Sequence, residues 1–142
     1  MLFDWFKSAE RKAALCKFDE DVNGWLSVLS AASDQQKVGV GVAVALVWQA
    51  LNDGFGSVQH FMKAPDDVRL AFLNRAREKT DELAQQEQRG DMPPGAGLGG
   101  KLAFAYVLAI SMNEMRRVAR LASVLEPCHK KAAVIGLGAV RR

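Results

Sequence analysis

Apolar side chains recur every three or four residues through most of this 142-residue chain. That spacing places them on one face of an α-helix, which is buried when helices pack together. One such face consists of Phe18, Val22, Trp25, Leu26, Leu29 and Ala32. We therefore predict an all-α fold, in which residues 1–142 form a single-domain bundle of about five to six helices.

The most apolar segment, residues 34–53, is predicted to be the central helix of this bundle. Ser33 and Gln36 match a capping box, in which each side chain bonds to the backbone amide of the other residue. The valines of Val38–Leu46 alternate, as they also would in a β-strand, so a strand stays open as the alternative. We favour a helix because the cap precedes the segment and Asn52–Gly54 supplies a stop signal.

This central segment is predicted to lie inside the protein and not in a membrane. Its apolar run, Val38–Leu51, has 14 residues, fewer than the ~20 that cross a bilayer. Gly39 and Ala43 lie four positions apart, as do Gly41 and Ala45. On a helix these small residues form a smooth surface that another helix can approach closely.

The last third of the chain is predicted to contain a loop, a long helix and a tail. Five glycines and two prolines make residues 90–100 a loop. A long C-terminal helix is expected over residues 101–126, because Pro127 lacks the amide that would continue it. Residues 127–142 are expected to form a basic tail or a short helix.

The segment Gly95–Lys101, where the predicted loop meets the long helix, matches the first seven positions of the phosphate-binding pattern G-x-x-x-x-G-K. Leu102 follows where the pattern requires Ser or Thr for magnesium, and no apolar strand precedes the loop. We therefore interpret the segment as a connector and expect no nucleotide cofactor, leaving open whether it binds an anion.

No arrangement of nucleophiles or metal ligands is recognisable. Cys16 and Cys128 are far apart and are interpreted as free thiols. Together with His60 and His129 they lack the short paired spacings of a zinc site. Acidic clusters, such as Asp19–Asp21, are interpreted as charges at helix starts. We expect no catalytic residues, no metal and no cofactor, and the absence of a secretory pattern at Met1 favours the cytoplasm.

Positive charge is concentrated in residues 101–142, which contain eight basic and two acidic side chains. At 100° per residue, three arginines of the predicted long helix project from one face. The candidate surface for an anionic partner consists of Arg116, Arg117, Arg120, Lys130, Lys131, Arg141 and Arg142. Arginine suits phosphate, but no aromatic side chain lies between these charges to stack on bases.

The N-terminal segment supplies a candidate apolar contact surface: Leu2, Phe3, Trp5 and Phe6. Aromatic residues followed by lysines and arginines also occur in helices at a membrane interface. We prefer the simpler interpretation, in which this helix packs on the bundle.

These observations favour a small intracellular protein–protein interaction module, an adaptor or regulator, either binding another protein or forming a homodimer. The alternative is a nucleic-acid-binding protein that uses the basic C-terminal face. The two hypotheses differ in whether the arginines lie open or are neutralised by Asp and Glu from neighbouring helices.

Overall fold

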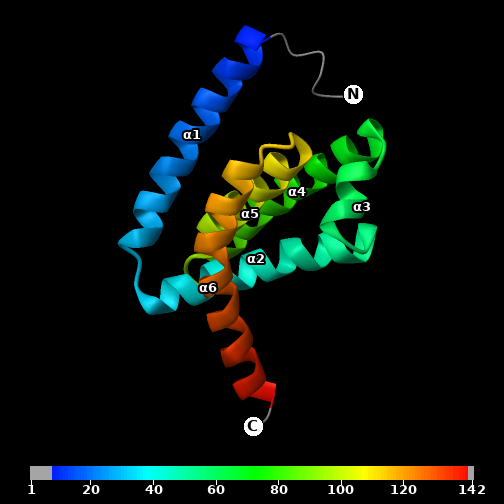
Figure 1. Cartoon of the computed structure of the whole chain (residues 1–142). Coiled ribbons are helices and arrows are strands. Elements are labelled where there is room, and N and C mark those ends of the chain that lie inside the picture. Colours follow the sequence, from blue (N-terminus) through cyan, green and yellow to red (C-terminus); the bar gives the residue numbers. More distant parts are fainter. Residues whose placement is uncertain (1–7, 141–142) are drawn as a thin grey trace.

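The computed structural model describes the backbone of residues 8–140 and the side chains of residues 9–134. Within this part of the chain the fold is a bundle of six α-helices without strands, which confirms the all-α prediction (Figure 1). The helices are α1 (Ser8–Ser30), α2 (Asp34–Phe55), α3 (Val58–Lys63), α4 (Asp66–Gln88), α5 (Ala96–Ser111) and α6 (Met115–Val140). Of the predicted surfaces, Leu2, Phe3, Trp5, Phe6, Arg141 and Arg142 lie outside the described residues.

Helix α2 is central, and the Val38–Leu46 segment is helical, as predicted. The amide of Gln36 donates to the Ser33 hydroxyl (3.2 Å), and the amide of Ser33 donates to the Gln36 side chain (2.9 Å), so the capping box is formed. The helix continues through Asn52–Gly54, the expected stop, and ends before Gly56, whose φ is +83°. Its buried valines face α5 and α6, between which it packs (Figure 1).

Glycines allow α2 to approach its neighbours closely. A methyl group at Gly39 would overlap the Pro94 carbonyl, and one at Gly41 would overlap the Cys128 carbonyl of α6. Gly99 of α5 faces the backbone of Val40 in the same way. These close approaches therefore require glycine, which has no Cβ atom. This confirms the predicted close approach of a neighbouring helix to α2.

The predicted loop over residues 90–100 needs correction, because α5 begins at Ala96. Its N-terminus is stabilised from another helix: the Glu87 carboxylate of α4 accepts a hydrogen bond from the Gly97 amide (2.7 Å). Gly97, Gly99 and Gly100 are buried helical residues. These glycines allow close packing against α2 and α4. Only residues 89–95 connect α4 to α5.

The long helix predicted over residues 101–126 is divided in two. Asn113 adopts a left-handed conformation (φ 58°), which asparagine tolerates better than most residues, and the chain turns between α5 and α6. The predicted stop at Pro127 is also wrong, since α6 continues to Val140. Pro127 removes one helical hydrogen bond, but Leu125 and Cys128 beside it are buried in the core and hold the helix in place.

Where α2, α3 and α4 meet, the core contains three aromatic rings and a buried arginine. Phe55, Phe61 and Phe72 contact one another edge to face, with centroids 4.9–5.5 Å apart. Arg69 of α4 is buried, pairs with Asp66, and donates to the carbonyl of Ser111 at 3.3 Å. This arginine therefore joins the start of α4 to the end of α5.

By length and composition alone, α2 is the one helix within residues 8–140 that is long and apolar enough to cross a membrane. A core helix of a soluble protein and a signal sequence both meet this criterion, and 39% of the most apolar stretch of α2 is buried in the structure. Helix α2 packs against both α5 and α6.

Candidate interaction site around helix α6

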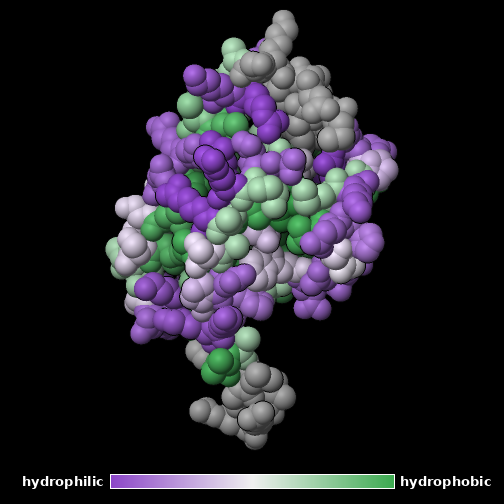
Figure 2. Space-filling model, viewed as in Figure 1, coloured by the Kyte–Doolittle hydropathy of each residue, from purple (hydrophilic) through white to green (hydrophobic). Residues whose placement is uncertain are grey.

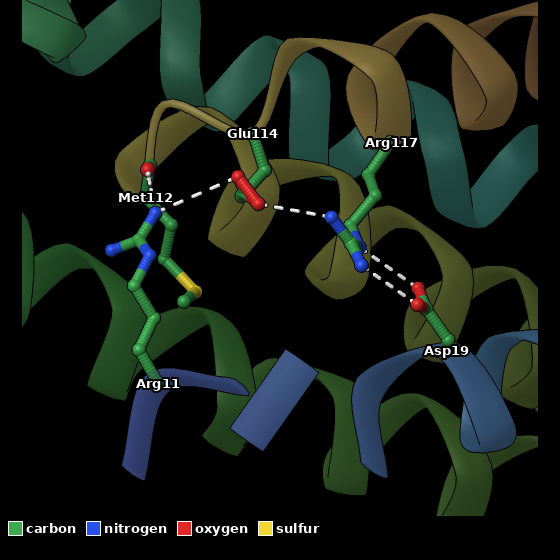
Figure 3. A network of polar contacts seen from close by, with 5 residues as sticks. All are labelled: Arg11, Asp19, Met112, Glu114 and Arg117. Carbon is green, nitrogen blue, oxygen red and sulfur yellow. Dashed lines mark hydrogen bonds and ion pairs between the residues drawn. The ribbon is translucent and has the colours of Figure 1, made fainter. Parts of the chain in front are cut away.

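Arg117, a residue of the predicted basic face, is neutralised by two carboxylates (Figure 3). Its Nε and Nη2 donate to the two carboxylate oxygens of Asp19 on α1, at 2.8 and 2.7 Å. Its Nη1 donates to Glu114 at 2.9 Å. The planar guanidinium thus makes a paired contact with α1 and a single contact with the start of its own helix.

Two further residues of α1, Arg11 and Asn23, extend this network. Arg11 donates to the Met112 carbonyl at 2.9 Å and lies 3.6 Å from Glu114, which therefore stands between two arginines (Figure 3). Arg120 donates to the Asn23 side chain at 2.6 Å. The polar groups of α1 are directed at the turn between α5 and α6 and at the first turns of α6.

In the ion pair of Asp19 and Arg117, each charge stabilises the other. The hydrogen bonds from Arg117 hold the pKa of Asp19 below its ordinary value, although partial burial acts in the opposite direction. The hydrogen bond to Asp19 likewise raises the pKa of Arg117. Both groups are therefore charged at neutral pH, and their attraction holds α1 against α6.

The basic residues of the predicted face therefore fall into two groups: some bond to other side chains, and others are exposed without a bond in the described part of the chain. Arg117 and Arg120 contact α1, and Lys131 pairs with Asp34 of α2 at 3.1 Å. Within residues 9–134, Arg116 and Lys130 are exposed and make no hydrogen bond or ion pair. Fewer positive charges are thus open to phosphate than the helical spacing alone implied.

A cavity of about 310 Å³ lies where α1, α2 and α6 meet. Its walls are apolar: Leu26 and Leu29 come from α1, and Val124, Pro127 and Cys128 come from α6. Its polar lining consists of Ser30, Lys37 and Lys131. Burial raises the pKa of the Cys128 thiol, so this group of the wall is neutral at pH 7.

A second, more open hollow of about 450 Å³ adjoins the other side of Lys131. It is lined by Asp34, Val38, Lys130, Lys131 and Val134. From here α6 projects beyond the other helices, and apolar surface is visible at the base of the projection (Figures 1 and 2). Val134, on the projecting part, is 69% exposed.

The remaining candidate groups are not brought together. Cys16 is exposed on α1, whereas Cys128 is buried. His60 bonds to the Ser57 hydroxyl (2.8 Å), and the His129 ring packs on Trp48 with centroids 5.0 Å apart. No group of three or more metal-ligating side chains occurs in the part of the chain that the structure describes.

Comparison of the chain with known proteins found no relative. No model of a protein family matches the chain, and neither a curated protein nor a solved structure matches it. The functional proposal therefore depends on the surfaces around α6.

Proposed function

We propose that this chain is a small helical interaction module, an adaptor or regulator of the cytoplasm, that binds through the projecting part of α6. The observation that carries the proposal is the exposure of Val134 on a helix that extends beyond the bundle, beside an open hollow. An exposed apolar side chain with charged residues at its rim suits packing against another helix.

A second copy of the chain fits this surface best. Two valines, Val38 and Val134, are surrounded by Asp34, Lys130 and Lys131, so the surface carries both signs of charge around an apolar centre. In a two-fold dimer the same patch meets itself, and Lys130 of one copy can face Asp34 of the other. The surface is thus complementary to itself in charge as well as in hydropathy.

Sedimentation velocity over a wide concentration range tests this proposal. We expect reversible dimers, and Val134→Asp is expected to weaken dimerisation at least about tenfold, because it places a charge in the contact. Val28→Asp is the matched control, since Val28 is 59% exposed on α1 and does not line the hollow. A chain that is monomeric throughout, or an equal effect of both variants, would refute the proposed dimer.

Nucleic-acid binding is the second candidate, supported by the exposed side chains of Arg116 and Lys130. The ion pairs of Arg117 and Lys131 favour the interaction module instead, because those charges already have partners. A mobility-shift assay separates the two: binding to DNA or RNA that weakens steeply with salt and with Arg116→Glu would favour the second candidate.

A further inference from the structure

The cavity between α1, α2 and α6 lies beside the hollow at the projecting end of α6, and Lys131 lines both. The walls and the mouth of this cavity differ in character. Hydrocarbon groups of Leu26, Leu29, Val124 and Pro127 form the walls. Its volume, about 310 Å³, is at the lower end of the range for small-molecule sites, roughly 300–1,000 Å³. A ligand of this site is therefore small and largely apolar.

The polar groups of the lining are cationic. Lys37 and Lys131 come from different helices, and no carboxylate of residues 9–134 lines the cavity. Both lysines line the cavity together with Cys128. The Ser30 hydroxyl already donates to the Ser27 carbonyl at 2.8 Å, which leaves the two lysines as the donors available to a ligand.

The ion pair of Lys131 does not block this role. Its partner Asp34 is 89% exposed and Lys131 is 45% exposed, with 3.1 Å between the charged atoms. Exposed pairs of this kind contribute little to stability, because water competes for both charges. A ligand carboxylate can therefore replace Asp34 at small cost.

We propose that this cavity binds a small amphiphilic carboxylate, a fatty acid of medium chain length. Its carboxylate pairs with Lys37 and Lys131 at the mouth, and its hydrocarbon chain lies against Leu26, Leu29 and Val124. The site thus recognises an anionic head and an apolar tail together.

Isothermal titration calorimetry with octanoate, hexanoate and 1-octanol tests both halves of this recognition. Octanoate is expected to bind saturably at one site. Hexanoate is expected to bind about tenfold more weakly, since it loses two buried methylenes. The neutral 1-octanol is expected to bind about tenfold or more below octanoate, because it cannot form the charged contacts.

Three substitutions locate the head group. Lys37→Met and Lys131→Met are each expected to weaken octanoate binding about three- to tenfold while keeping the aliphatic stems. Asp34→Asn removes the competing carboxylate and is expected to strengthen binding about two- to fivefold. Lys79→Met is the control, since Lys79 is 42% exposed and lines a groove between α2 and α4 instead.

A purely structural role for these residues cannot produce opposite effects of Lys131→Met and Asp34→Asn. Amide chemical-shift changes on adding octanoate are expected to centre on residues 26–30 and 124–131. Absence of binding would overturn the proposal. So would equal affinity for octanoate and 1-octanol, unchanged affinity in both lysine variants, or shifts centred on Lys79.

Discussion

At the scale of single residues, the contact between Asp19 and Arg117 makes the attachment of α1 depend on pH. The pKa of Asp19 is lower in the folded chain than its ordinary 3.8, so the ionised carboxylate favours the folded state. Its contribution is complete above that value and is lost as the pH falls through the lower, folded pKa. Because Asp19 is 39% exposed, solvent screening limits the contribution to about 1 kcal/mol or less.

We therefore expect Asp19→Asn to lower the free energy of unfolding at pH 7 by about that amount and to have little effect near pH 2, as measured by urea denaturation. Asp21→Asn is the control on the same helix, because Asp21 faces only Lys17 at 3.6 Å. If Asp19→Asn had the same effect at pH 7 and pH 2, the ion pair would not be the cause.

Only part of this site could be predicted from the sequence. Helical spacing puts Arg116, Arg117 and Arg120 on one helix, and in the structure Arg117 and Arg120 bond to side chains of α1. The partner of Arg117 lies 98 positions away, and nothing in the sequence distinguishes Asp19 from other acidic residues in helices. Pairing across such a distance, and a cavity made by three helices, follow from tertiary packing and leave no local signal.

At the scale of elements, the glycines of α2 and α5 set how closely helices cross. Gly39→Ala and Gly99→Ala place a methyl group against the backbone of a neighbouring segment, and each is expected to lower the free energy of unfolding by about 2 kcal/mol or more. Gly24→Ala in α1 meets no atom within 4 Å and should instead raise it by about 0.5–1 kcal/mol. Chemical denaturation at neutral pH measures all three.

The sign of the change distinguishes packing from helix propensity. Propensity alone makes all three substitutions stabilising, since alanine is the better helix former. Stabilisation by Gly39→Ala or Gly99→Ala would therefore contradict the close crossings described above.

The same elements show where prediction from sequence succeeds. The start of α2 follows from Ser33 and Gln36, because a capping box is a local interaction. The start of α5 does not, since the Gly97 amide in its first turn donates to Glu87, a residue ten positions away on another helix. Pro127 was interpreted as a stop because its own hydrogen bond is lost, yet burial of the residues around it outweighs that loss.

At the scale of the whole molecule, the helices differ in how they are held. Helices α2 and α5 pack against each other and against other helices, and Gly99 of α5 lies at backbone distance from Val40 of α2. Helix α1 lies at the edge, connected to α2 by a short turn (Figure 1). It is held by a single apolar stripe that includes Val22 and Leu29, and by its polar contacts with α6.

This difference predicts that α1 opens without the rest of the bundle unfolding. In hydrogen exchange followed by mass spectrometry at neutral pH, amides of α1 should exchange at least about tenfold faster than those of α2 and α5. Arg117→Met should accelerate exchange in α1 alone, because it removes the contact with Asp19. Arg116→Met, on the same helix but without a described partner, should leave exchange unchanged. Equal protection of α1 and α2, or acceleration spread over all six helices by Arg117→Met, would mean that α1 is an integral part of one cooperative unit.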